Sequence, residues 1–271
     1  MENFKWVNRA ALIFLVLLFA WTYFAKNNYR NVDDAHPDVL KEPVQKEAIN
    51  QEPIEFSKDD YQYSLKPLYE FELNAMIVNR LDYRKFSISK KDSVFPMDLC
   101  VVWGDNVKSK VYQSKMLSFS QDFRMCFWRW FGNLEFNNNQ AANVHLIIKE
   151  ESLADKLKLL SSGDQVKVKG QLVNVSAKNT GQSDIGNSSA FNMRSSTIRN
   201  DTGPGACEII NVEDIEIIKK GNPLAFTLYR LSYPLLIILI ILNIAWFLIK
   251  NYKAASADPE EHSGPLFQDH Q

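Results

Sequence analysis

Hydrophobic residues are concentrated in two long runs near the ends of the chain, and between these runs they alternate with polar residues. The clearest alternation follows the Gly163-Asp164 turn: Val166, Val168, Gly170 and Leu172 share one parity, and Gln165, Lys167, Lys169 and Gln171 share the other. This period of two predicts a strand with one buried face. The apolar parity slips after Leu172, just beyond Gly170, which predicts a bend or a β-bulge there.

The segments before and after this strand give an order of elements. Residues 68–81, 99–103 and 124–131 read as three strands, and residues 144–148 read as a further short strand or as the lead into a helix. A capping box at 152–155, followed by Leu157, Leu160 and Gly163, predicts one helix. The strand at 165–173 and a last strand at 206–218 come after it. Three strands, a helix and two strands are the order of an OB fold, so we expect a mainly β domain over 59–220: an OB-like five-stranded barrel with one helix.

The two apolar runs predict transmembrane helices at 6–26 and 229–250, with the barrel inserted between them. The first run also resembles a cleaved signal peptide, but Tyr23 is too large for the small residue that cleavage requires, so we interpret it as an uncleaved signal anchor. In the second run Asn243 is the only strongly polar side chain. An Asn inside a span either contacts another helix, in the same chain or in another subunit, or bonds its own helix backbone; we expect the helix contact.

One polar segment lies between the first apolar run and the predicted barrel, and a second follows the last apolar run. Residues 27–58 contain Pro37, Pro43 and Pro53 and no sustained apolar period, which predicts an extended linker, although packing on the domain stays open. Residues 251–271 predict a disordered polar tail.

Two spans place both termini on one side of the membrane and the middle domain on the other. Basic residues flank the spans on both sides, so their bias does not decide the orientation. The signal-anchor character of the first run favours cytoplasmic termini and an extracytoplasmic domain, which in a bacterial inner membrane would be periplasmic.

The balance of basic and acidic residues argues against one class of partner, the nucleic acids. The chain has 31 Lys and Arg residues against 32 Asp and Glu residues, with no basic stripe, so we expect no nucleic-acid partner. No phosphate-binding loop, dinucleotide-binding glycine pattern or nucleophile elbow is present, and we expect no cofactor. The expected partners are the bilayer and a protein, either a second copy or another subunit.

The three cysteines allow one disulfide and one remaining thiol in an oxidising compartment. Cys100 and Cys207 each lie beside a turn, and we predict that they pair; the alternative is three buried, reduced thiols. His145 is the only histidine in the predicted domain, and the cysteines lack the close spacing of metal ligands, so no metal site is expected. Catalysis by a Cys–His pair would require one cysteine to lie near His145 in the fold.

Two stretches near turns hold the candidate binding residues. The first, 98–106, contains Asp98, Trp103 and Asp105, and the second, 195–208, contains Arg199, Asp201 and Glu208. Loops at the ends of barrel strands often bind ligands, so Arg199 is a candidate for holding an anionic group or for pairing with Asp201. The alternative is that these residues make turns and that Arg199 belongs to a structural ion pair.

The segments 98–106, 163–173 and 202–208 resemble those of uncharacterised bacterial proteins that have a membrane-anchored OB-like domain. A looser resemblance is to NfeD-like membrane proteins, which also join spans to a small OB barrel, although here the barrel lies between the spans. The resemblance implies a fold and no particular activity.

These observations favour a non-catalytic envelope protein whose OB-like domain binds a protein partner or helps to assemble a membrane complex. The first alternative is a module that binds oligosaccharide or another small envelope ligand. The second is an enzyme that depends on a thiol.

Overall fold

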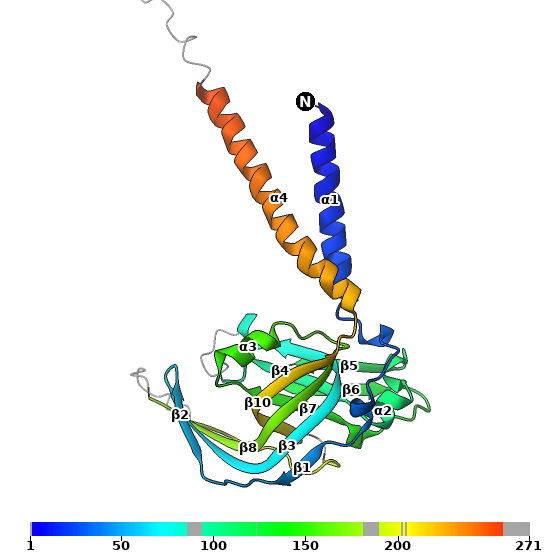
Figure 1. Cartoon of the computed structure of the whole chain (residues 1–271), viewed down its shortest axis with the longest axis vertical. Helices are drawn as coiled ribbons and strands as arrows, with labels where there is room; N and C mark the ends of the chain where they lie inside the picture. Colours follow the sequence, from blue (N-terminus) through cyan, green and yellow to red (C-terminus); the bar gives the residue numbers. More distant parts are fainter. Residues whose placement is uncertain are drawn as a thin grey trace, which may run out of the picture. The chain divides into compact units, whose positions relative to one another are not determined.

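A computed structural model describes residues 2–85, 94–122, 124–180, 190–201, 203 and 205–256. The described chain is mainly β, and it divides into two compact units. One unit contains the two terminal helices, and the other contains residues 26–223. Figure 1 shows the elements of both units.

The terminal unit consists of α1 (Glu2–Ala25) and α4 (Pro223–Ser256). Within them, Trp6–Ala25 and Pro223–Lys253 are long and apolar enough to cross a membrane. At about 1.5 Å per residue, each stretch reaches across a hydrocarbon core of about 30 Å. The predicted second span, 229–250, lies inside the longer helix α4.

The middle unit contains one eight-stranded mixed sheet and a separate two-stranded sheet. The large sheet is built from β1 (Val44–Glu47), β2 (Ile54–Lys58), β3 (Tyr61–Asp82), β4 (Met97–Val102), β7 (Ala141–Ile147), β8 (Gln165–Asn179), β9 (Phe191–Met193) and β10 (Cys207–Lys219). The small sheet is a hairpin of β5 (Leu117–Asp122) and β6 (Met125–Trp130). The short helices α2 (Asp105–Lys108) and α3 (Glu151–Leu157) accompany the sheets, together with single turns of 3-10 helix at Tyr29–Asn31, Pro37–Leu40, Tyr83–Lys85, Val111–Gln113 and Asn138–Gln140.

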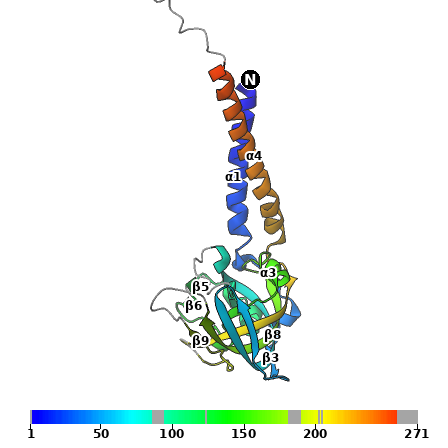
Figure 2. The same ribbon diagram turned by 90° about the vertical axis from the view of Figure 1, so that its left-hand side faces the viewer.

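Pairing among five strands follows a closed circuit. β3 pairs with β4, β4 with β7, β7 with β10, β10 with β8, and β8 with β3. The β7–β10 pair is parallel and the others are antiparallel, and α3 lies in the chain between β7 and β8. Figure 2 shows β3 and β8 side by side, as this register requires.

Two sequence-based predictions differ from this arrangement. Residues 124–131, predicted as the third strand of the barrel, contribute β6 to the separate hairpin, and β7 occupies the third position of the circuit. Residues 27–58, predicted as an extended linker, contain β1, β2 and two 3-10 turns and belong to the compact middle unit. Val39 in this segment is completely buried, so the segment packs on the domain. Of the predicted tail, 251–256 continue α4, and the rest lies outside the described residues.

Gly170 lies where β8 and β10 approach each other closely. It pairs with Val212 of β10, and the register shifts between Val212 and Asp214. A Cβ atom on Gly170 would lie 2.1 Å from the carbonyl oxygen of Asn211, so only glycine allows this close approach of two backbones. The sequence predicted the irregularity in β8 itself; the register shifts lie instead on its two neighbours, between Val212 and Asp214 of β10 and between Pro67 and Tyr69 of β3.

The main core lies on the inner face of the circuit. Alternate residues of β4, β7 and β8 form this core, among them Leu99, Val101, Val144, Leu146 and Val168. The opposite face of β4 is also buried, because residues 29–39 and the β5–β6 hairpin pack against Cys100 and Val102. As a result every residue of β4 is buried, and polar side chains on its outer face need partners inside the protein.

Candidate functional site

Polar side chains gather on the outer face of three neighbouring strands. The register pairs Asp98 of β4 with His145 of β7, and Asn143 of β7 with Cys207 of β10. Paired residues in a sheet point to the same face, so these four side chains share the outer face. All four are buried. With Tyr83 and Arg124 they form what we call the Asp98 cluster.

Asp98 is the centre of the cluster, and none of its surface is exposed. The hydroxyl of Tyr83 donates to its Oδ2 at 2.8 Å. Its Oδ1 lies 3.2 Å from Nη1 of Arg124 and 2.9 Å from Nδ1 of His145. A buried carboxylate is tolerated only when it is paired and hydrogen-bonded, and these three contacts meet that requirement.

The electrostatics of the cluster favour a charged His145. Burial by itself would lower the pKa of this imidazole, but the contacts with Asp98 and Cys207 outweigh burial and raise the pKa to about 9. Burial and the adjacent Asp98 carboxylate also raise the pKa of Tyr83 above its ordinary value, so the phenol stays protonated. The Asp98 side chain thus lies between the His145 imidazole and the Arg124 guanidinium.

Arg124 belongs to the turn between β5 and β6 and has a φ of 73°. Its backbone N–H donates to the Tyr83 hydroxyl at 2.9 Å, and its carbonyl oxygen accepts from Nδ2 of Asn143 at 2.7 Å. Its guanidinium carbon lies 4.0 Å from the centroid of the Tyr83 ring and 5.0 Å from that of Phe95. Backbone and side chain together hold the hairpin turn over Asp98.

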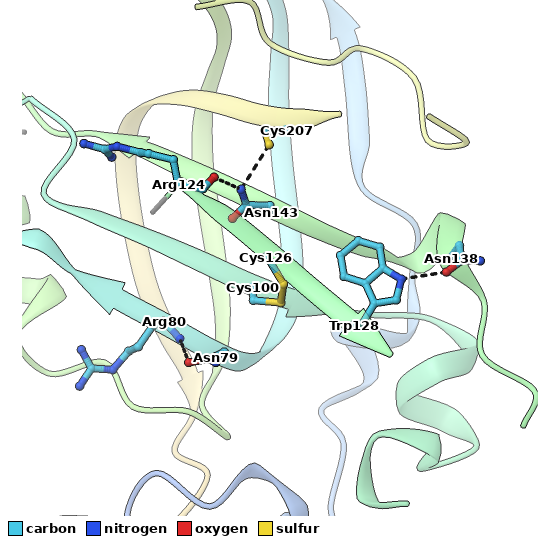
Figure 3. Close-up of a disulfide and its surroundings, with 9 residues drawn as sticks. All are labelled: Asn79, Arg80, Cys100, Arg124, Cys126, Trp128, Asn138, Asn143 and Cys207. Carbon is cyan, nitrogen blue, oxygen red and sulfur yellow. Dashed lines mark hydrogen bonds between the residues drawn. A yellow bond between two sulfur atoms is a disulfide. The ribbon is translucent and has the colours of Figure 1, made fainter. Parts of the chain in front are cut away.

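A disulfide joins the same hairpin to β4, and it corrects the predicted pairing. Cys100 is bonded to Cys126 of β6, with Cα atoms 5.7 Å apart, and Cys207 is free and buried. The predicted Cys100–Cys207 bond is wrong because Asn143 of β7 pairs with both residues and lies between them. Two strand spacings amount to about 9.6 Å, beyond the roughly 7 Å limit between Cα atoms that a disulfide can bridge. Figure 3 shows Asn143 between the disulfide and Cys207, with its Nδ2 3.2 Å from the Cys207 sulfur.

Arg199 and Glu208 form a second group. Nη1 of Arg199 lies 2.6 Å from Oε1 of Glu208, and Nη2 donates to Oε1 of Gln45 at 2.8 Å. The guanidinium also lies over the ring of Phe71. Asp201, the other candidate partner, accepts instead from the hydroxyl of Ser196 at 2.5 Å. The structure thus places Arg199 in an internal ion pair.

Glu208 is nearly inaccessible, and burial raises the pKa of its carboxyl to about 7 although Arg199 opposes the shift. The group therefore titrates near neutral pH.

Trp103 and Asp105 belong to a third group, just after the C-terminal end of β4. The indole N–H of Trp103 donates to Glu42 at 2.9 Å, and Gln140 donates to the other oxygen of Glu42 at 2.6 Å. The backbone N–H of Asp105 donates to Gln140 at 2.6 Å. The predicted site residues thus fall into three groups with different partners: Asp98; Trp103 and Asp105; and Arg199, Asp201 and Glu208.

Sequence reasoning missed Tyr83, Arg124 and Asn143 as members of a site. A charged residue within each of two apolar strands, Asp98 and His145, was the available signal, since such residues need each other when buried. Nothing in the local sequence shows that the Arg124 turn covers them. Among the described residues, no group of His, Cys, Asp and Glu side chains could hold a metal ion.

The β5–β6 hairpin also has an exposed apolar surface, which we call the aromatic hairpin surface. Its members are Met116 (47% exposed), Phe127 (40%) and Phe131 (75%). On the other side of the hairpin, Leu117 and Cys126 are buried against the domain, and Trp130, which pairs with Leu117, lies on that side against Phe136. The hairpin is thus attached by one face and presents large apolar side chains to solvent on the other.

Comparison of the chain with protein-family models, curated proteins and solved structures finds no significant match.

Proposed function

We propose that the chain is a non-catalytic, membrane-anchored protein that binds a protein partner through the aromatic hairpin surface. The observation that carries this proposal is the exposure of Met116, Phe127 and Phe131 on the outer face of one hairpin. Contiguous exposed apolar patches mark interaction sites, and aromatic, Met and Arg residues are enriched at protein interfaces. Arg129, also exposed, lies between Phe127 and Phe131 in the sequence.

Rigidity of the hairpin supports the same role. The Cys100–Cys126 bond and the contacts of Arg124 attach it to the domain. A surface that is ordered before binding loses less conformational entropy when a partner arrives.

The proposed scaffold is an OB-type barrel. The closed circuit of five strands, the parallel pairing of its third and fifth members (β7 and β10) and the helix α3 between the third and fourth support this assignment. In OB folds the face of the second and third strands binds ligands. Here these strands are β4 and β7, and the hairpin covers them, so binding would move to the surface of the hairpin itself.

We further propose that the middle domain is extracytoplasmic, in a bacterial periplasm, and that both termini are cytoplasmic. The disulfide supports this orientation, because disulfides persist in oxidising compartments and are rare in the cytosol.

The alternative of an oligosaccharide-binding module depended on Arg199. Its guanidinium is bound to Glu208 and Gln45, so an anionic or sugar ligand would have to displace both. No specific contact favours this function over a protein partner.

Site-specific photocrosslinking in the native membrane tests the proposal. A photoreactive amino acid at position 131 should give a discrete crosslinked band that contains a second protein, whereas the same probe at Ile198, which is 56% exposed, should not. Phe127→Ser should weaken the band from position 131, because it removes another apolar side chain from the same face of the hairpin. Identical patterns from positions 131 and 198 would contradict a specific surface on the hairpin.

A further inference from the structure

The guanidinium of Arg124 occupies a site built from three other residues. The Tyr83 and Phe95 rings lie 4.0 and 5.0 Å from its carbon atom. Nη1 is 3.2 Å from Oδ1 of Asp98 and 3.4 Å from the carbonyl oxygen of Phe95. Aromatic faces together with a carboxylate and a carbonyl form a binding site for a planar cation.

The protein places Arg124 in this site from a separate element. Tyr83 follows β3, Phe95 precedes β4 and Asp98 belongs to β4, whereas Arg124 belongs to the hairpin turn. The positive φ of Arg124 is a conformation that costs on the order of 1 kcal/mol for a residue with a side chain. The contacts of the Arg124 guanidinium with Asp98, Tyr83 and Phe95 therefore offset the cost of its left-handed backbone conformation.

Within the part of the chain that the structure describes, the hairpin pairs with no strand of the large sheet. A two-stranded hairpin is marginally stable alone, so its attachment depends on side-chain contacts and on the Cys100–Cys126 bond. Cys126 is two residues from Arg124, and Cys100 is two residues from Asp98. The disulfide thus holds the guanidinium and its carboxylate partner together.

We propose that Tyr83, Phe95 and Asp98 form a guanidinium-binding site that Arg124 fills from within the chain, and that an arginine side chain of a protein partner enters it when the hairpin is displaced. Loss of the Cys100–Cys126 bond favours displacement, because this bond holds the hairpin to β4. Tyr83, Phe95 and Asp98 are not part of the aromatic hairpin surface, although the same hairpin carries that surface and Arg124.

Chemical rescue of full-length Arg124→Ala in detergent tests whether the site recognises guanidinium. Methylguanidinium at ten times its dissociation constant should raise the Tm of this variant by about 3–6 °C and leave wild type unchanged. Methylammonium and urea at equal concentration should do little, since neither combines a planar face with a charge. Arg124→Gln serves as a second background in case Arg124→Ala folds poorly, and Arg129→Ala, from the exposed side of the hairpin, is the matched control that should show no rescue.

A second arm tests entry of a partner arginine. The peptide acetyl-Gly-Arg-Gly-amide should bind the Cys100→Ser/Cys126→Ser protein at least tenfold more tightly than oxidised wild type, and its citrulline analogue should not bind. Adding Phe95→Leu to either background should abolish binding and rescue, because it removes one aromatic face.

If methylguanidinium stabilises neither Arg124→Ala nor Arg124→Gln, the proposed guanidinium-binding site is wrong. Rescue without peptide binding to the disulfide-free protein would overturn the entry of a partner arginine. Both results would leave the crosslink expected at position 131 unaffected, because that crosslink reports a different surface.

Discussion

His145 is buried beside Asp98, and its charge links the stability of the domain to pH. Its pKa is raised to about 9 in the folded protein, against an ordinary value of 6.5. The folded state therefore binds this proton more tightly, and the stabilisation is complete below pH 6.5 and is lost as the pH rises through 9. We expect the free energy of unfolding to fall by roughly 1–3 kcal/mol between these pH values, measured by thermal or denaturant unfolding of the full chain in detergent.

The control for this prediction is His145→Gln, which keeps a polar side chain without a titrating group. Glu208 also loses stabilisation with rising pH, because its folded pKa is raised to about 7, but its effect lies between pH 4.5 and 7. The window above pH 7 therefore reports mainly His145. An equal slope in His145→Gln across this window would show that another group is responsible.

The contacts of single residues could not be predicted from the sequence. Asp98 and Glu208 were singled out as turn residues that could bind ligands, yet both lie within strands and are bonded inside the protein. The reason is that strand register, which places Asp98 opposite His145 and Cys207 opposite Asn143, depends on contacts between segments far apart in the chain. One sequence does not contain that information in a local pattern.

At the scale of elements, the hairpin depends on its disulfide. The Cys100–Cys126 bond spans 26 residues, and a loop of that size restricts the unfolded chain by about 3–4 kcal/mol. Cys126→Ser should therefore lower the free energy of unfolding by about that amount. Thermal unfolding with and without reductant measures it, and reductant should have no further effect on the variant.

Cys207→Ser is the matched control, because Cys207 is buried and forms no disulfide. It should change stability by about 1 kcal/mol or less while keeping the effect of the reductant. Losses of similar size in both variants would mean that the disulfide adds no more than the packing of a buried sulfur.

Gly170 allows β8 and β10 to approach each other, and alanine at this position should be costly. Its Cβ atom would meet the Asn211 carbonyl at 2.1 Å, so the backbone has to shift. We expect a loss of about 2–3 kcal/mol in unfolding free energy. Gly132→Ala is the comparison: its nearest neighbour would be Met116 Sδ at 3.7 Å, so only the positive φ opposes it, at about 1 kcal/mol. A loss at Gly170 no larger than that at Gly132 would show that the strands adapt.

Element prediction succeeded where periodicity was strong. The strand at 165–173 is present and extends to Asn179, because Val175 and Ala177 pack on a second cluster with Tyr63 and Phe191. The strand at 124–131 exists but covers the sheet, since aromatic residues on both parities fit a hairpin attached by one face as well as a buried strand. β1 contains one apolar residue, Val44, and β2 contains two, Ile54 and Phe56, so each strand is too short for its pattern to stand out, and the pairing with β3 is not local.

At the scale of the whole molecule, two spans and an intervening disulfide domain predict one orientation. We expect Ile198→Cys to react with an impermeant thiol reagent in intact cells, because this position is exposed on the domain. A cysteine added after Gln271 should react only after lysis. Labelling is read as a mass shift, with Cys207→Ser as the background. The opposite pattern would place the domain in the cytoplasm and remove the support that the disulfide gives to the proposed compartment.

A pair of asparagine side chains joins the two helices of the terminal unit. The side chains of Asn8 in α1 and Asn243 in α4 are hydrogen-bonded to each other. Asn243 also donates to the carbonyl of Leu239 in its own helix at 2.7 Å, so the expected helix contact and the alternative backbone bond occur together. A contact between Asn side chains inside a bilayer stabilises a helix pair by about 1 kcal/mol, which orients the helices without fixing them rigidly.

Oxidation of Asn8→Cys/Asn243→Cys in the Cys207→Ser background should therefore give an intramolecular crosslink, seen after proteolysis between the helices. The matched control is Asn8→Cys/Ile244→Cys, because the next position is rotated by about 100° around an α-helix and faces away from Asn8. A crosslinked dimer in place of the intramolecular product would assign the contact to two subunits. Equal crosslinking at positions 243 and 244 would mean that the Asn pair does not orient the helices, and the spans would then act only as anchors.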